Sequence, residues 1–153
     1  MNETKRIVTP LLAVDAVILF AEGIVLIKRD NPPFAGCYAL PGGFVEVGET
    51  VEAAASREAR EETGLAIDLL ELVGIYSNPA RDPRGHVVSA AFLARGRGEL
   101  LAGSDARMSQ VFPLMGLPPL AFDHDKIISD ALSLVKSHST KKARFDDGTI
   151  TLK

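Results

Sequence analysis

Residues 43–65 read GFVEVGETVEAAASREAREETGL, and this stretch decides the fold that we expect for the chain. Thr50 is of a residue type that often caps the start of a helix, because its side-chain oxygen accepts a hydrogen bond from an unpaired backbone N–H. Gly64 readily adopts the backbone conformation at which helices end. The sequence therefore predicts a helix that starts after Thr50 and runs to about Thr63.

The predicted helix has a narrow apolar stripe that is suited to close packing on a sheet. On a helical wheel this stripe consists of Val51, Ala54, Ala55 and Ala59. Glu58 and Glu62 fall within about 20° of Val51, inside the stripe, and Glu61 lies at its edge, about 80° away. A salt-bridged surface helix would instead direct its glutamates outward, as this helix does with Glu52.

Acidic side chains on a half-buried stripe point to a bound cation. Three carboxylates repel one another there unless a positive group joins them. A hard divalent cation with oxygen ligands is the natural partner, and Mg²⁺ is the commonest choice near phosphates. Helical spacing of three and four residues lets Glu58, Glu61 and Glu62 converge on one or more ions. The alternative is an acidic patch neutralised by Arg57 and Arg60.

Length and composition are those of a single globular domain spanning residues 1–153. The 153 residues are 46% hydrophobic and 24% charged, and the net charge is −3. This balance argues against a nucleic-acid partner, because such binding depends on clustered cations. Cys37 cannot form an internal disulfide and suits a reducing cytoplasm. The apolar run over residues 11–20 contains Asp15 and is too short to cross a membrane, which indicates a buried strand and no membrane partner.

Patterns outside the acidic helix predict an α/β fold in which helices pack on a mixed sheet. Two apolar runs read as a hairpin, over residues 13–20 and 24–28. Further strands are expected at residues 39–40, 69–76, 87–95 and 111–114, and a second helix at 123–136. Residues 137–153 read as a polar, flexible tail with a weak strand at 149–152.

The acidic helix belongs to a longer spaced motif. Its fixed positions are Gly43, Glu49, Arg57-Glu58-Ala59, Glu61-Glu62 and Gly64-Leu65. With this spacing the chain resembles the Nudix hydrolases, whose box runs Gly, five residues, Glu, seven residues, then Arg-Glu-aliphatic-x-Glu-Glu-x-Gly-aliphatic. Residues 40–44, 81–86 and 120–124 also resemble the ADP-ribose pyrophosphatase-like members. The resemblance covers residues 10–135 and implies a Nudix α/β/α sandwich with a mixed sheet.

The resemblance implies metal-assisted hydrolysis of a nucleoside diphosphate linked to another group. Glu58, Glu61 and Glu62 would hold Mg²⁺, or Mn²⁺ in its place, with the backbone carbonyl of Gly43 or its neighbour Gly42. Glu49 and Arg57 would form an ion pair that keeps loop and helix in register. The general base stays open between the box residues Glu58 and Glu61 and a more distant loop acid. Of the loop acids we favour Asp105 over Glu99.

Candidate substrate-binding residues lie outside the box. Arg29, at a strand end, would bind phosphate or remain a solvated surface arginine. Arg81, Arg84 and His86 belong to a polar loop that resembles the family's substrate loop, although Asp82-Pro83 would also order a simple turn there. Phe112 occupies a strand on which related members often carry a tryptophan, so it would have to replace that aromatic group.

The leading functional hypothesis is an enzyme that converts ADP-ribose to AMP and ribose 5-phosphate. Hydrolysis of nucleoside triphosphates, including oxidised ones, is an alternative, because the box carries no information about the base. A non-catalytic nucleotide sensor is a second alternative. Such sensors often have a degraded box and a DNA-binding segment, whereas every acidic position of the box is intact here. Many family members form homodimers, which leaves a homodimer open for this chain.

Overall fold

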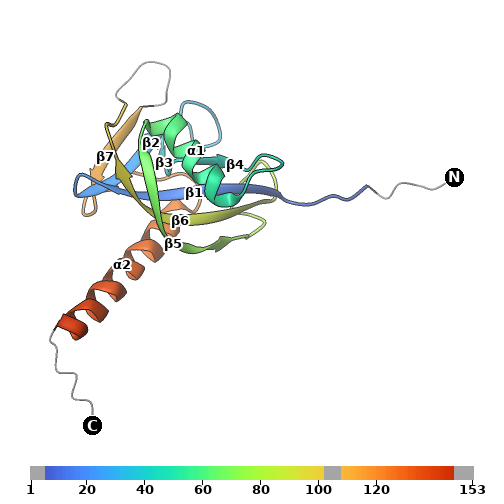
Figure 1. The fold of residues 1–153 in the computed structure, drawn as a ribbon. Coiled ribbons are helices and arrows are strands. Elements are labelled where there is room, and N and C mark those ends of the chain that lie inside the picture. The colour runs from blue at the N-terminus through green and yellow to red at the C-terminus, as the bar shows by residue number, and fades with distance from the viewer. Residues whose placement is uncertain (1–5, 102–107, 147–153) are drawn as a thin grey trace, which may run out of the picture.

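The computed structural model describes residues 6–101 and 108–146, with side chains as far as residue 139. Figure 1 shows the path of the chain. The elements in chain order are β1 (Leu11–Phe20), β2 (Gly23–Lys28), β3 (Tyr38–Ala39), β4 (Gly42–Phe44), α1 (Val51–Thr63), β5 (Ala66–Tyr76), β6 (Val87–Arg97), β7 (Ser109–Pro113) and α2 (His124–Asp146). Within these residues, no helix combines the length and apolarity that a membrane span requires.

The strands form a mixed seven-stranded sheet with the order β3-β2-β1-β6-β5. β1 runs parallel to β6, from the pair Leu11–Val87 to the pair Leu19–Arg95. β1 and β2 form the predicted hairpin but pair only beside its turn. Farther along, β4 pairs with β1 and β7 pairs with β2. Because β1 takes β4 as a neighbour at this end, the two adjacent glycines of β4 lie directly beside the buried part of β1.

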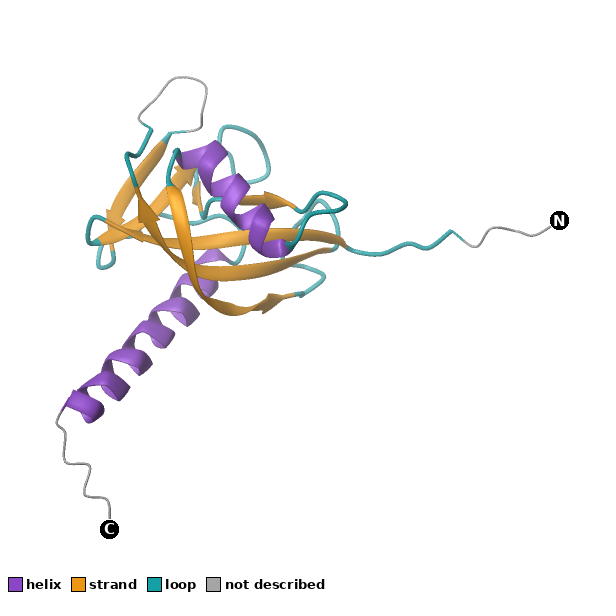
Figure 2. Ribbon diagram, viewed as in Figure 1, coloured by secondary structure: helices purple, strands orange, loops and turns teal. Residues whose placement is uncertain are grey.

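The two helices lie on different sides of the strands (Figure 2), which makes the predicted α/β/α sandwich. Alternate side chains of β1 divide between the two layers, as expected for a strand buried on both faces. Val14 packs with Ala54 and Ala55 of α1. Val17 belongs instead to the cluster that contains Ile127 and Ile128 of α2. Asp15 shares the α2 side with Val17, and it is the feature of β1 that matters for the site.

Helix α1 matches its prediction at both ends. The side chain of Thr50 accepts a hydrogen bond from the N–H of Ala53 at 3.1 Å. Gly64 has φ 75° and its N–H bonds to the carbonyl of Arg60. Ala54, Ala55 and Ala59 are buried, as the helical wheel predicts, so the small residues let α1 approach the sheet closely.

Several element boundaries differ from the predictions, and one strand was not predicted at all. α2 runs to Asp146, well beyond the expected end at residue 136, because its polar second half contains no glycine or proline to stop it. β5 begins earlier than expected, at Ala66. β4 was not predicted, since paired glycines are a poor strand signal. The weak strand expected at 149–152 lies outside the described residues.

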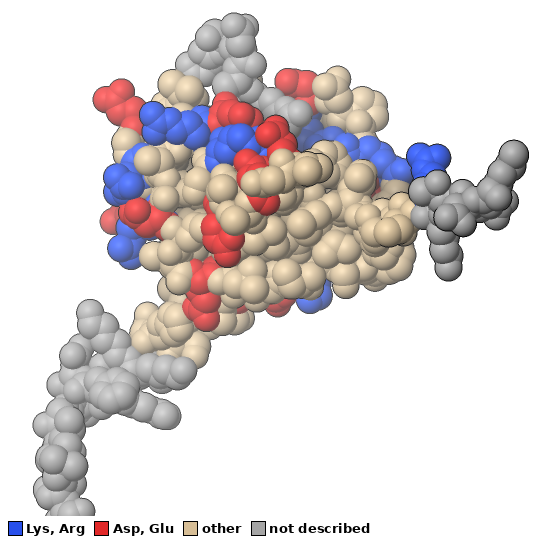
Figure 3. Space-filling view, turned by 45° about the vertical axis from the view of Figure 1, so that its right-hand side comes forward, with Lys and Arg blue, Asp and Glu red and all other residues tan. Residues whose placement is uncertain are grey.

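Charged side chains are not spread evenly over the surface. On the face in Figure 3, acidic and basic side chains are interspersed around α1, and a wide neighbouring area carries uncharged residues. Basic groups therefore lie close to the acidic side chains of α1 and influence the electrostatics there.

Candidate active site

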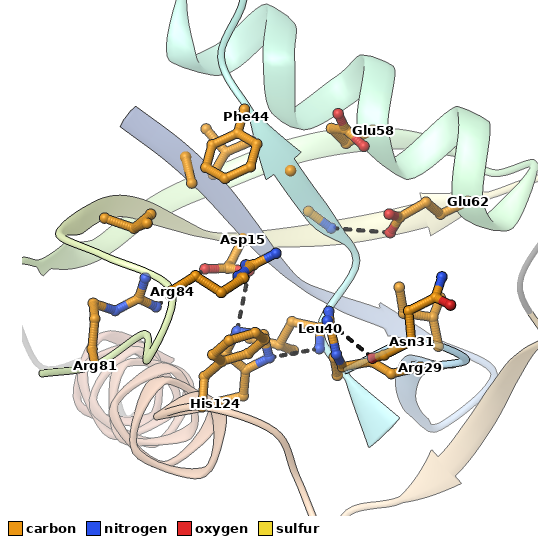
Figure 4. A pocket seen from close by; sticks show the side chains of 18 of the residues that line it. Asp15, Arg29, Asn31, Leu40, Phe44, Glu58, Glu62, Arg81, Arg84 and His124 are labelled. Atoms are coloured by element: carbon orange, nitrogen blue, oxygen red, sulfur yellow. Dashed lines mark hydrogen bonds and ion pairs between the residues drawn. The ribbon is translucent and has the colours of Figure 1, made fainter. Parts of the chain in front are cut away.

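A cavity of about 410 Å³ opens beside β1, β4, α1 and the start of α2. Figure 4 shows that side chains from opposite directions point into it. One wall is acidic and rich in backbone, consisting of Gly42, Gly43, Glu58 and Glu62. The facing wall carries Arg29, Arg81 and Arg84, and the floor contains Asp15 and His124. We call the first set the acidic wall and the three arginines with Phe122 the basic wall.

Close packing of α1 on β4 creates the acidic wall. The N–H of Gly42 donates to Oε2 of Glu62 at 3.1 Å. A Cβ atom on Gly43 would lie 2.5 Å from the carboxylate of Glu58, so only glycine allows this approach. Two carboxylates beside the half-buried backbone of Gly42 and Gly43 make an all-oxygen donor set. This donor chemistry fits a hard divalent cation such as Mg²⁺.

Arg57 links the acidic wall to the loop before α1. Its Nε donates to Glu49 at 2.7 Å and its Nη2 donates to the same carboxylate at 2.9 Å, so the expected Glu49–Arg57 ion pair is present. These bonds, with the backbone N–H of Glu46, lower the pKa of Glu49 to about 2. Nη1 of Arg57 also donates to Glu58 at 2.8 Å. Arg57 therefore fixes the orientation of one carboxylate of the wall.

Glu61 is the one of the three expected metal-binding glutamates that does not line the cavity. Its side chain is 59% exposed and lies 3.4 Å from Nη1 of Arg57. Among the described side chains, no group of three or more His, Cys, Asp or Glu residues is arranged to hold a metal ion. Of the three glutamates expected to converge on a metal ion, Glu58 and Glu62 line the cavity, whereas Glu61, at the edge of the helical stripe, does not.

Only one of the two loop acids considered as general base lies within the described residues. Asp105, the favoured one, lies outside the described residues. Glu99 is exposed and is not among the residues that line the cavity.

Arg81 lies in the basic wall, but its guanidinium is satisfied within the protein. Its Nε and Nη2 donate to Asp123 at 2.9 and 2.7 Å. The side chain is 5% exposed, and Nη2 also lies 3.6 Å from Asp15. Burial opposes the charge, yet the bonds to Asp123 and the nearby carboxylates raise the pKa of Arg81 overall. This residue ties the loop to the start of α2.

Arg84 and Arg29 share one aromatic ring. The guanidinium of Arg84 lies 5.6 Å from the ring centre of Phe122, and that of Arg29 lies 4.9 Å from it. Arg84 is held by Asp82 at 2.8 Å but is 49% exposed. Arg29 donates through Nε to the carbonyl of Pro33 at 2.8 Å. The ring of Phe122 holds both guanidinium groups at the cavity, and the ion pair with Asp82 also holds Arg84 there.

Two predicted substrate residues lie outside the cavity. Nε2 of His86 lies 3.1 Å from the carbonyl oxygen of Ser77, and the ring is exposed. Phe112 packs edge-on against Tyr38, with ring centres 4.8 Å apart, beside the core cluster under α2. The pairing of β7 with β2 directs Phe112 into that core. The aromatic residues that line the cavity are instead Phe44 and Phe122.

The floor of the cavity was missed as a functional feature. Asp15 and His124 are 7% and 4% exposed, respectively. Burial raises the pKa of Asp15, but His124, Ser89 and Arg81 outweigh burial, so that the net shift is downward. One signal was available in the sequence: Asp15 is the only charged residue in the apolar run over residues 11–20. His124 lies within the second predicted helix, expected at residues 123–136, and it begins α2.

Comparison with known proteins agrees with this geometry. The family model described as NUDIX domain matches residues 9–131. The ADP-ribose pyrophosphatase of Methanocaldococcus jannaschii is 57% identical over 122 residues, which cover 79% of this chain and 72% of that protein. A MutT/nudix family protein from Enterococcus faecalis superposes with a TM-score of 0.79 at 35% identity, over 88% of this chain and 65% of that one.

A liganded structure is also similar. The NUDIX domain of Shewanella oneidensis NrtR, solved as a cocrystal with ADP ribose, superposes with a TM-score of 0.73 at 28% identity and covers 84% of this chain and 90% of that chain. The matched residues 9–131 include α1, the sheet, the start of α2 and all residues that line the cavity. With its box, its sandwich and this sequence match, the chain belongs to the Nudix family of hydrolases.

Proposed function

We propose that the protein hydrolyses ADP-ribose to AMP and ribose 5-phosphate with the help of bound Mg²⁺. The observation that carries this proposal is the pairing of an acidic wall with a basic wall across one cavity. The negative charge of a diphosphate has to be neutralised when it binds. The arginines would supply positive charge from one side of the cavity, and metal ions held by Glu58 and Glu62 would supply it from the other. The 57% identity to a protein named ADP-ribose pyrophosphatase supports the choice of substrate.

The residues of the acidic wall would hold the metal and orient the diphosphate. When bound, the metal neutralises the diphosphate and makes a nearby water molecule more acidic. Glu58, Glu62 and the backbone of Gly43 are the proposed ligands, and the exposed Glu61 is a further one that has to turn inward. Arg57 holds Glu58 in place through the bond at 2.8 Å.

The remaining chemistry is proton transfer and charge balance. Water attacks one phosphorus atom, the bond from that phosphorus to the bridging oxygen breaks, and a carboxylate removes the proton of the water. We assign this base to Glu58, Glu61 or Asp105. Arg84 and Arg29 would bind the diphosphate oxygens on the far side, where charge-assisted hydrogen bonds are strong. Arg81 would support that wall from below.

The proposed partner is a small nucleotide rather than a nucleic acid, and a homodimer is the proposed assembly. A net charge of −3 supports the first inference. Exposed apolar side chains on the edge strand β5, among them Leu70, Leu72 and Ile75, support the second. The lone cysteine, Cys37, fits a reducing cytoplasm.

The test is product release from a substrate panel with Mg²⁺: ADP-ribose, NADH, diadenosine polyphosphates, dGTP and 8-oxo-dGTP. We expect AMP and ribose 5-phosphate from ADP-ribose at the highest kcat/KM, with activity lost in EDTA and restored by Mg²⁺. A higher kcat/KM for a triphosphate would replace the proposed substrate. Tight binding of ADP-ribose without turnover of any compound would favour the sensor.

A further inference from the structure

A buried polar cluster lies under the floor of the cavity and connects three elements. Oγ of Ser89, on β6, donates to Oδ2 of Asp15 at 2.5 Å. Nε2 of His124, at the start of α2, lies 3.3 Å from Oδ1 of the same carboxylate. Ser89 is fully buried, and Asp15 and His124 are nearly so. Burying polar groups costs free energy unless each finds a hydrogen-bond partner, and in this cluster each of the three side chains has one.

The hydrogen bonds fix the tautomer and orientation of His124. The backbone N–H of Leu40 donates to Nδ1 of the ring at 3.0 Å, so Nδ1 carries no proton. The proton of the neutral ring is therefore on Nε2, which faces Asp15. Leu40 follows directly after the end of β3, where strand pairing stops. The ring thus supplies the acceptor for a buried N–H that strand pairing no longer serves.

The residues after Leu40 build the acidic wall. The carbonyl of Pro41 accepts a hydrogen bond from the N–H of Ala16 at 2.9 Å. Gly42 then donates to Glu62 at 3.1 Å, and Gly43 lies against the carboxylate of Glu58. His124 therefore anchors the start of a short, glycine-containing segment whose far end carries the proposed metal-binding backbone. Figure 4 shows this path from His124 through Leu40 to the segment facing Glu62.

The start of α2 is itself tied to the same strand. The N–H of Ala121 donates to the carbonyl of Tyr38 at 2.8 Å, and Tyr38 forms a parallel bridge with Leu120. Because residues 120–121 run beside β3, His124 reaches Leu40 without any long side-chain extension. The backbone pairing brings the ring to this position, and Asp15 sets its rotation.

We propose that His124, oriented by Asp15 and Ser89, is a positioning residue that holds residues 40–43 so that Gly42 and Gly43 meet Glu62 and Glu58 in the geometry that binds the divalent metal. This inference deepens the proposed function and depends on its metal site, but not on ADP-ribose as the substrate. His124 touches neither metal nor substrate in this role. It acts through the backbone of Leu40.

Two near-isosteric variants separate the two hydrogen bonds of the ring. In His124→Asn, the side-chain oxygen can take the position of Nδ1 and still accept from Leu40. In His124→Gln, the side-chain nitrogen can take the position of Nε2 and still donate to Asp15, but the bond to Leu40 is lost. His138→Gln, on the exposed part of the same helix, serves as the matched control.

The primary readout is the dissociation constant of Mn²⁺ for the substrate-free protein, measured from the electron paramagnetic resonance signal of free Mn²⁺. We expect His124→Gln to weaken Mn²⁺ binding by about tenfold or more, as removal of groups that orient metal ligands generally does. His124→Asn should stay within about threefold of the wild type. In the Gln variant kcat should fall with metal affinity, while KM for ADP-ribose at saturating metal stays nearly constant.

Equal Mn²⁺ affinity in the wild type and His124→Gln would overturn the proposal. The proposal would also be overturned if His124→Gln and His124→Asn lost Mn²⁺ affinity equally and in proportion to the drop in their thermal unfolding midpoints. In that case the ring would only stabilise the fold. If His124→Gln does not fold, Ser89→Ala takes its place. We expect Ser89→Ala to weaken Mn²⁺ binding by about threefold, and an unchanged Mn²⁺ affinity in this variant would contradict the proposal. If the wild type binds Mn²⁺ but leaves ADP-ribose intact, the proposed substrate fails while the Mn²⁺ affinities still decide the role of His124.

Discussion

The acidic wall and the basic wall of the cavity face each other but are built in different ways. Glu58 and Glu62 belong to one regular helix, and the glycines beside them lie on the adjacent β4. The basic wall is collected from distant parts of the chain: Arg29 after β2, Arg81 and Arg84 between β5 and β6, and Phe122 before α2. Helical periodicity can position the first set from sequence, whereas only tertiary contacts position the second.

Two arginines within the basic wall show how much these contacts matter. Arg81 and Arg84 are three positions apart on one loop, yet their side chains are 5% and 49% exposed. Arg81 is bound by a carboxylate from another element, Asp123, and Arg84 by its near neighbour Asp82. Pairing with the distant Asp123 gives Arg81 a structural role, whereas pairing with the nearby Asp82 leaves Arg84 half exposed at the cavity.

Arg81→Ala should produce the largest effect, and the effect should be on stability. Removing the guanidinium leaves Asp123 and the buried Asp15 without a counter-charge, which costs about 3–5 kcal/mol in buried ion pairs. The measurement is the free energy of unfolding from urea titrations. Arg97→Ala, which breaks the exposed pair with Asp68, is the control and should cost no more than about 1 kcal/mol. A normal unfolding free energy with a raised KM would move Arg81 into the substrate site.

Glu62→Gln should reduce turnover strongly while the fold is retained. The amide oxygen still accepts from Gly42, but the charge that would hold a divalent cation is gone. We expect kcat to fall about 100-fold at fixed Mg²⁺. Glu52→Gln, on the exposed face of the same helix, should stay within about twofold of the wild type. Comparable losses in both variants would mean that the two faces of α1 do not differ in function.

Arg84→Ala should raise KM for ADP-ribose about tenfold, which is typical of losing a hydrogen bond to a charged group. The unfolding free energy should also fall, because the Asp82 carboxylate is 3% exposed and loses the guanidinium that pairs with it, while it keeps the backbone N–H of residue 84. Arg60→Ala, on the outer face of α1, is the control. If KM is unchanged for every substrate in the panel, Asp82 and Arg84 only order the loop.

The smallest effect concerns the pH dependence of the Glu49–Arg57 ion pair. The pKa of Glu49 is depressed from 4.5 to about 2 in the folded protein. Its contribution to stability is therefore fully present above about pH 4.5 and is lost as the pH falls towards 2. The unfolding difference between wild type and Glu49→Gln should shrink between about pH 5 and pH 3. A difference that stays constant over this range would show that the carboxylate charge does not contribute.

The features that sequence predicts best here are those coded by neighbouring residues. Thr50 and Gly64 define α1 because capping is local chemistry, and Ala54, Ala55 and Ala59 define its buried face because the helical period is fixed. Helical periodicity does not decide the orientation of Glu61. A side chain at the edge of the apolar stripe points towards the cavity or towards solvent according to what packs beside it. The polar second half of α2 has neither an apolar stripe nor a stop signal, so its length was underestimated.

The basic wall shows the limit of such reasoning. Alternation along β7 predicts two faces for the strand, but its pairing with β2 decides that Phe112 points into the core. Likewise, no local pattern shows that Arg81 meets Asp123, or that Phe122 lies under two guanidinium groups. Asp15 could have been recognised, because an acidic residue in an apolar run needs a buried partner.

The pairing of β1 with β6 has a consequence for how the protein is made. Leu11 pairs with Val87 and Leu19 with Arg95, so the central strand finds this parallel neighbour only after most of the chain has left the ribosome. Until then β1, which is almost entirely apolar at its centre, can contact only its hairpin partner, β4 and α1. Distant parallel pairing of this kind slows folding and exposes apolar strands to aggregation. The newborn chain should therefore depend on chaperones more than its modest size suggests.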